Sequence, residues 1–386
     1  MRKSIICVFI IILFSLFNVY CDDEEDLLKS QLDSMDISEI EKFVDEINRE
    51  TEGLIPAIDV RSLVLGMFKG DTLNNLKEIG RGIANLFFKE VILNFSLLGK
   101  LLILAIFCAV LQNLHNAFEE DAIGKLAYSL CYILIIIMSV NSFYSAMKIG
   151  IEAIDTMVGF MQALLPTLLA LLVSVGGISS SAVFQPLIFG SITVITTIIK
   201  NFVMPLVLFS AILSILNNLS ESINISKLAS LLKQTAVGVL GLALTAFTGI
   251  ITVQGLASSS IDGATIRTAK FAVDNFIPIV GKFLSDAFDA VVSCSMILKN
   301  GIGIAGLIVL LLICSFPLVK MFSIIIIYKL TSALIEPILD NQIVQCLNDM
   351  SNSMLVLLTC VIAVAFMFFM ALTVIMGVGN MAVLVR

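Results

Sequence analysis

The stretch Thr265–Gly303, TIRTAKFAVDNFIPIVGKFLSDAFDAVVSCSMILKNGIG, is a charged island in a strongly apolar neighbourhood. Apolar runs flank it at Thr235–Ala257 and Gly301–Tyr328. Pro278 and Gly281 interrupt the island, because proline lacks the N–H that a helix interior needs and glycine weakens a helix. We therefore expect two short amphipathic pieces here rather than one rod.

Charged side chains are spread along the island, with apolar groups at helical spacing between them. A segment of this kind lies in the membrane interface, dips back into the bilayer, or lines a water-filled cavity. The sequence leaves these three placements open. The candidate pore, plug or partner contacts are Arg267, Lys270, Asp274, Lys282, Asp286, Asp289 and Lys299.

The composition of the whole chain sets the fold class. Of its 386 residues, 59% are hydrophobic and only 14% are charged. A soluble domain does not need that much apolar surface, and the apolar runs are long enough to be membrane-spanning helices. No strand-length alternation of apolar and polar residues suggests a membrane barrel. The expected fold is therefore all-α, a polytopic transmembrane helical bundle.

The N-terminal part of the chain holds most of the acidity. Asp22–Glu52 carries 13 acidic and 3 basic residues, a net charge of −10, whereas the whole chain carries −7. This uneven balance argues against nucleic-acid binding. Asp36 is expected to cap a helix, with Glu39 completing a capping box. The segment predicts a small acidic helical domain whose charged face is either solvated or a docking surface for another protein.

The first residues have the layout of a secretory signal. Met1–Lys3 is basic, and Ile5–Tyr20 forms a short apolar core. Val19 and Cys21 suit a cleavage site that would leave Asp22 as the mature N-terminus, and an uncleaved anchor is the alternative. In both cases the acidic domain is expected outside the cytoplasm.

The remaining apolar runs predict a series of membrane spans. Lys100 lies near the start of the first span, and Lys320 lies in an apolar run, Gly301–Leu330, that crosses once or twice. Both lysines are candidate intramembrane polar residues. The other expected spans are Ile92–Leu114, Leu126–Met147, Met157–Val175 and Ser353–Val378.

The run Ala182–Leu216 is too long for one crossing, because about 20 residues suffice. Lys200 and Asn201 lie near its middle and suggest a tight turn between two spans. The alternative is one tilted and broken helix with Lys200 inside the bundle, which makes Lys200 a third candidate intramembrane polar residue.

No motif for catalysis or cofactor binding is present. We find no HExxH, P-loop or GxSxG motif and no paired carboxylates inside a span. The eight cysteines form no CxxC pair and there is a single histidine, so we expect buried cysteines and no metal site. The chain is therefore not expected to be an enzyme, and no cofactor is expected.

These patterns divide the chain into five segments. They are a signal peptide at 1–21, the acidic extracytoplasmic domain at 22–90, a first group of transmembrane helices at 91–257, the amphipathic, re-entrant-like segment at 258–300, and a C-terminal group of transmembrane helices at 301–386.

Several motifs along the chain resemble the stage III sporulation protein AE family. Two long ones are Asp36–Asn48, DISEIEKFVDEIN, and Leu97–Leu114, LLGKLLILAIFCAVLQNL. Together the motifs cover nearly the whole length and are specific as a set. The shorter ones are Phe160–Pro166, Asn217–Ser220, Arg267–Phe271, Phe276–Pro278, Lys282–Ala287, Leu298–Asn300, Tyr328–Leu330, Glu336–Pro337 and Cys346–Met350.

This resemblance implies a multi-pass protein of the mother-cell membrane that surrounds the forespore. Its implied partners are membrane lipid, the other products of the same sporulation operon, including a cytoplasmic ATPase and ring-forming membrane proteins, and a forespore membrane protein. Together they would form a secretion-like channel complex required for endospore development. The resemblance carries over no catalytic residue.

Three functional hypotheses remain open. The chain is an export-gate-like part of the conduit, a non-conducting scaffold that assembles the ring proteins, or a stand-alone permease for small molecules. For the conduit we expect Asp274, Lys282, Asp286 and Asp289 to matter most. For the scaffold we expect the acidic segment Asp22–Arg49 to matter most.

Overall fold

The computed structural model describes residues 30–32, 35–50, 58–69, 72–117, 122–219, 225–276, 281–339 and 341–384. Within these ranges the chain is helical and contains no strand, so the all-α prediction is confirmed. The helices are α3 (Ser38–Glu50), α4 (Val60–Lys69), α5 (Thr72–Ala117), α6 (Ala122–Ser174), α7 (Ile178–Ile198), the π-helix η1 (Ile199–Val203), α8 (Met204–Leu219), α9 (Ser226–Phe276), α10 (Gly281–Ile335) and α11 (Asn341–Leu384).

Six of the described helical segments are long and apolar enough to cross a membrane. Several helices greatly exceed the bilayer: α6 has 53 residues and α10 has 55. At 1.5 Å per residue each is about 80 Å long, against a hydrocarbon core of about 30 Å. The six segments are Glu78–Leu111, Ser129–Ser174, Ile178–Asn217, Ser226–Gly255, Val291–Ile335 and Gln342–Val378.

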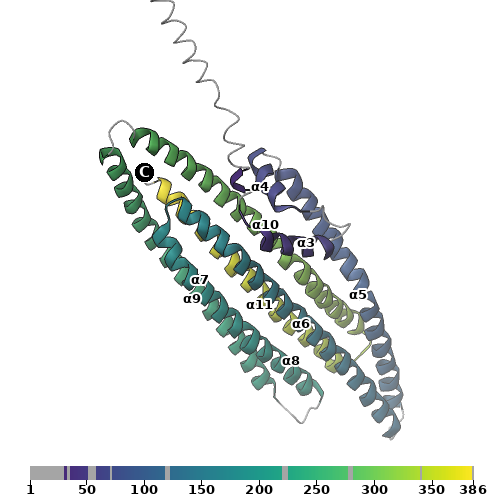
Figure 1. The fold of residues 1–386 in the computed structure, drawn as a ribbon. Helices are drawn as coiled ribbons and strands as arrows, with labels where there is room; N and C mark the ends of the chain where they lie inside the picture. Colours follow the sequence, from purple (N-terminus) through teal and green to yellow (C-terminus); the bar gives the residue numbers. More distant parts are fainter. Residues whose placement is uncertain are drawn as a thin grey trace, which may run out of the picture.

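The long helices pack side by side as a bundle (Figure 1). The α7–α8 rod and α9 lie on one side, α5 lies on the other, and α6, α10 and α11 lie between them. Hydrogen bonds between helices join this arrangement: Asn94 Nδ2 donates to Ser323 Oγ at 2.8 Å, and Ser210 Oγ donates to the Ala229 carbonyl at 2.7 Å. Such bonds help to hold helices together where apolar burial alone does not distinguish neighbours from lipid.

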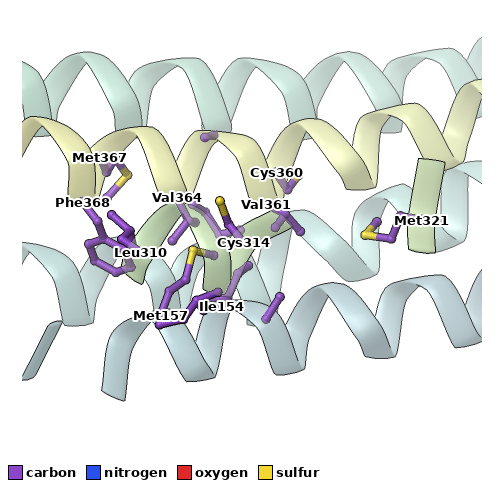
Figure 2. Packing of buried hydrophobic residues seen from close by; sticks show 14 of the residues in the cluster. Ile154, Met157, Leu310, Cys314, Met321, Cys360, Val361, Val364, Met367 and Phe368 are labelled. Atoms are coloured by element: carbon purple, nitrogen blue, oxygen red, sulfur yellow. The ribbon is translucent and has the colours of Figure 1, made fainter. Parts of the chain in front are cut away.

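The core lies where α6, α10 and α11 meet. Figure 2 shows Ile154 of α6, Cys314 of α10 and Val364 of α11 gathered between the three helices. Cys314 and Cys360 are buried among aliphatic side chains, and neither is in a disulfide. The prediction that cysteines act as small buried apolar residues is confirmed for these two.

Three glycines let α10 approach its neighbours closely. A Cβ on Gly306 would lie 2.4 Å from Leu164 Cδ2 of α6, and one on Gly303 would lie 2.5 Å from Met376 Sδ of α11. A Cβ on Gly301 would lie 3.0 Å from Val64 Cγ1 of α4. Each glycine therefore provides the space that a side chain of another helix occupies.

The N-terminal helices α3 and α4 dock on the bundle. The apolar face of α3 is buried, including Ile40 and Val44, and Phe43 meets Phe160 of α6 edge to face with ring centroids 5.8 Å apart. Asn48 links α3 to the start of α4, because its amide both donates to and accepts from the backbone of Ile58 at 2.8 Å. The apolar face of α3 is thus used within the chain.

The start of α3 agrees with the expected cap in part. Asp36 Oδ1 accepts hydrogen bonds from the Ser38 N–H at 3.2 Å and the Ser38 hydroxyl at 2.6 Å. These bonds hold the pKa of Asp36 below its ordinary value. Glu39 pairs with Lys42 at 2.5 Å, so it supports the helix surface by an i,i+3 contact.

The link between α6 and α7 is short, because α6 ends at Ser174 and α7 begins at Ile178. Gly176 has φ of 95°, a left-handed conformation that favours glycine. The N–H of Gly177 donates to the Leu172 carbonyl at 2.8 Å, and that of Gly176 donates to the Val173 carbonyl at 2.8 Å, which closes the end of α6.

The structure corrects one part of the sequence-based segmentation and decides another that the sequence left open. The expected spans Leu126–Met147 and Met157–Val175 form one continuous helix, α6, and Pro166 lies inside it. Gly301–Leu330 lies within one helix, α10, with Pro317 inside it. In both cases packing on neighbouring helices keeps a helix regular through residues that would end it in isolation.

The charged island is also placed differently from expectation. Its two parts are not short pieces: the first is the end of α9 and the second is the start of α10. Helix α9 ends at Phe276 and α10 begins at Gly281, and residues 277–280, where the break at Pro278 is expected, lie outside the described residues. Helices α5, α9 and α10 run through the segment boundaries drawn at 90/91, 257/258 and 300/301.

We predict that Gly306→Val destabilises the bundle, because the new side chain would collide with Leu164. Overpacking of this kind costs about 1–3 kcal/mol. The measurement is the thermal melting temperature of the purified chain in detergent. The control is Gly241→Val, since a Cβ there meets nothing within 4 Å. Equal melting temperatures for the two variants would contradict the proposed packing.

Candidate functional site: a charge cluster at the middle of the bundle

Charged side chains from several helices lie near one height of the bundle. A Cβ on Gly150 of α6 would touch Met204 of α8, Met321 of α10 and Val361 of α11, which places these residues at the same level. The charged residues near this level lie on α6, η1 and α10, and we call them the mid-bundle charge cluster. They are Lys148, Glu152, Asp155, Lys200 and Lys320.

Two ion pairs connect members of the cluster. Lys200 Nζ of η1 pairs with Asp155 Oδ1 of α6, across two helices. Lys148 Nζ lies 3.7 Å from Glu152 Oε1, one turn along α6. The Lys200 side chain is 25% exposed and that of Asp155 is 53% exposed. The pair is therefore partly shielded, and its charges neutralise each other where a lone charge would be costly.

The π-helix η1 accounts for the position of Lys200. Pro205 has no N–H to donate to the carbonyl one turn before it, so a regular helix cannot continue through this point unchanged. The chain accommodates this with a wider turn, in which the Met204 N–H donates to the Ile199 carbonyl five residues earlier. Lys200 lies in this turn and reaches Asp155.

The expected turn at Lys200–Asn201 is therefore wrong, and the alternative of one helix through this point agrees with the structure, in which Lys200 is partly buried. The helical path continues from α7 through η1 into α8 without a loop. Asn201 is exposed within η1. The sequence contains the two residues that explain this geometry, Lys200 and Pro205, which lie five residues apart.

The other candidate residues have varied environments. Lys100 of α5 is exposed, and Lys320 of α10 is half-buried with its ammonium 4.3 Å from the centre of the Phe316 ring. Such a contact stabilises a cation that has lost part of its water. Six island residues have side chains outside the described residues: Arg267, Lys270, Asp274, Lys282, Asp286 and Asp289.

Lys299 is the one island candidate whose side chain is described, and it is fully buried. Its Nζ donates to the Met376 carbonyl of α11 at 2.9 Å. The contact lies one turn from Gly303, where Met376 packs directly on α10. The geometry gives Lys299 a role in joining α10 to α11, whereas a pore or plug residue would need access to water.

The described residues contain no group of three or more His, Cys, Asp or Glu side chains that could hold a metal ion. The chemistry available at the cluster is therefore that of carboxylates and ammonium groups. Paired charges at this depth suit the passage or binding of charged and polar molecules.

The family is decided by comparison with known proteins. A family model described as stage III sporulation protein AE matches residues 58–379. A relative of that name from Bacillus subtilis (strain 168) is 40% identical over 367 residues, covering 95% of this chain and 92% of the relative. The chain belongs to the stage III sporulation protein AE family. No solved structure matches the chain. The resemblance found in the sequence motifs is thus confirmed.

The sequence-based prediction did not include the three residues that α6 contributes to the mid-bundle charge cluster of this stage III sporulation protein AE family member. Lys148, Glu152 and Asp155 fall between the expected spans Leu126–Met147 and Met157–Val175, and they were not named as candidates. Their spacing of four and three residues puts them on one helical face, and this signal favours a continuous helix. The apolar residues on both sides concealed it, because each run alone is long enough to span a bilayer.

We predict that Lys299→Ala lowers the melting temperature of the purified chain, whereas Lys299→Met lowers it less. Both variants lose the bond to the Met376 carbonyl, but methionine retains most of the buried volume. The control is Lys329→Ala, an exposed position on the same helix. A Lys299→Ala variant as stable as the parent protein would refute the joining role.

Proposed function

We propose that this protein is an integral-membrane component of a channel complex that joins the mother cell to the forespore during endospore development. Membership of the stage III sporulation protein AE family and the name of the 40% identical relative support a role in sporulation. Six apolar helices support a multi-pass membrane protein. Its place is the mother-cell membrane around the forespore, with the N-terminal acidic helices outside the mother-cell cytoplasm.

The observation that carries the conduit function is the mid-bundle charge cluster. It lies between apolar stretches on α6, on the α7–η1–α8 rod and on α10. Charged residues within membrane segments are costly and usually face a water-filled path or a bound polar molecule. The pair Asp155–Lys200 joins two rods at this height, so it is placed to control how closely they approach.

The partners in this proposal are the other products of the same operon, including an ATPase and ring-forming membrane proteins, and a forespore membrane protein. The absence of a phosphate-binding P-loop motif in the sequence fits a separate energy source.

A scaffold is the second candidate function, and the docking of α3 favours it. Because the apolar face of α3 is used within the chain, its outward face presents charged residues, including Glu39 and Asp45. A ring protein could bind this face through charge complementarity without disturbing the bundle. In that case the charge cluster would be dispensable.

We predict that Asp155→Lys and Lys200→Asp each reduce heat-resistant spores about tenfold or more, because each change sets like charges against one another. The double variant, with the charges exchanged, should recover most of the loss. The measurement is the spore count in a sporulating host that carries this gene in place of its own.

Membrane fractions should contain equal amounts of all three variants, as shown by immunoblot. The matched control is Lys227→Asp, which changes an exposed lysine on α9 outside the mid-bundle charge cluster. Normal spore counts in both single variants would reject the conduit proposal and leave the scaffold. Loss in the single variants without recovery in the double variant would show that each charge acts alone.

A further inference from the structure

A cavity of about 150 Å³ lies under α3, where α3 meets α6 and α10. It is distinct from the Asp155–Lys200 pair, which neither contacts nor lines it. Its walls combine apolar and charged side chains from all three helices. The charged ones are Glu46 of α3, Glu152 of α6 and Lys320 of α10.

Charges of opposite sign line this cavity without meeting. Lys320 comes from α10, Glu152 from α6 and Glu46 from α3. Lys320 stacks on Phe316 and forms no ion pair with any of the described residues. Glu46 likewise forms none within that part of the chain, and Glu152 has only the 3.7 Å contact with Lys148. The volume between a half-buried ammonium and two carboxylates is therefore available to a molecule that carries both complementary charges.

The backbone of α10 adds an acceptor to the same wall. Pro317 has no N–H, so the carbonyl of Ile313, four residues earlier, lacks its usual helical donor. Ile313 and Pro317 both line the cavity. Thr156 lies on the α6 side, where its hydroxyl donates to the Glu152 carbonyl at 3.0 Å and keeps lone pairs for a ligand N–H. Freed carbonyls in broken helices are a usual way to bind cationic groups within membranes.

The size and the apolar walls limit what fits. A cavity of about 150 Å³ admits a ligand the size of benzene, roughly six heavy atoms. Phe43 and Phe316 contribute aromatic surface, and Ile47, Ile149 and Leu312 contribute aliphatic surface. Glu46 and Glu152 are solvent-exposed, so the cavity can be entered from their side.

We propose that this cavity binds a small zwitterion of the α-amino acid type. Its carboxylate pairs with Lys320, its ammonium is shared by Glu46, Glu152 and the Ile313 carbonyl, and a short apolar side chain lies against the phenyl rings. A simple anion would face two carboxylates, and a simple cation would face the lysine, so a molecule with both charges is favoured. Because α3 supplies part of the wall, bound ligand also strengthens the docking of α3.

The test is isothermal titration of the purified full-length chain in detergent with glycine, alanine and valine. Propionate and ethylammonium serve as ligands that keep one charged end of alanine each. Saturable binding of at least one amino acid below about 10 mM is expected, and neither single-charge ligand should bind as tightly. Lys320→Met and Glu46→Gln should each weaken binding about tenfold.

Lys329→Met is the matched control, since Lys329 lies on α10 but lines a different, apolar groove. Its affinity should equal that of the parent chain. The exposed position of Glu46 makes Glu46→Gln informative even if Lys320→Met misfolds. The proposal is overturned if no amino acid binds, if both variants bind like the parent, or if propionate or ethylammonium binds as tightly as alanine. The site shares Glu152 and Lys320 with the mid-bundle charge cluster but not the Asp155–Lys200 pair, so the spore counts of the pair variants and the titrations can fail separately.

Discussion

The close approach of α10 to its neighbours is the constraint on which the rest of the bundle depends. Three glycines within six residues, Gly301, Gly303 and Gly306, face α4, α11 and α6 in turn. Without side chains at these positions, helices with bulky apolar surfaces can pack at short range on three sides of α10. This packing stabilises a helix of 55 residues through Pro317 and Lys320, neither of which an isolated helix would tolerate easily.

The same packing explains why charged residues persist at the middle of the bundle. Once α6, α10 and the α7–η1–α8 rod are held in register, Asp155 and Lys200 are brought together, and their charges compensate. Two other lysines are stabilised by different contacts: Lys320 lies over the Phe316 ring, and Lys299 donates to the Met376 carbonyl. Each of these contacts lowers, by a different physical interaction, the free-energy cost of placing a cation in a low-dielectric environment.

The helical fold followed from sequence because apolar composition and run length are strong signals of membrane helices. The continuity of α6 did not follow, because Lys148, Glu152 and Asp155 reduce local hydropathy as a loop would, and only tertiary packing shows that the helix persists. Predicting the mid-bundle charge cluster would require two facts that a single sequence does not contain: which helices are neighbours, and at what height they align. The charges of the island lie close together in the sequence, so the sequence alone makes them candidates. Asp155 and Lys200 lie 45 residues apart and meet only in the fold.

Proline and charged residues occur at the same height in this protein. Lys200 is followed by Pro205-Leu206-Val207, and Lys320 is preceded by Pro317-Leu318-Val319. The tight glycine contacts lie elsewhere: Gly306 is 14 residues from Lys320, about 21 Å along α10. Proline frees carbonyl groups and weakens the helix locally, so a change at the charges can be absorbed at Pro205 and Pro317 while the contacts at Gly303 and Gly306 hold. The contacts at Gly303 and Gly306 therefore fix the architecture of the bundle at one height, and its polar groups can rearrange at another height, near Pro205 and Pro317.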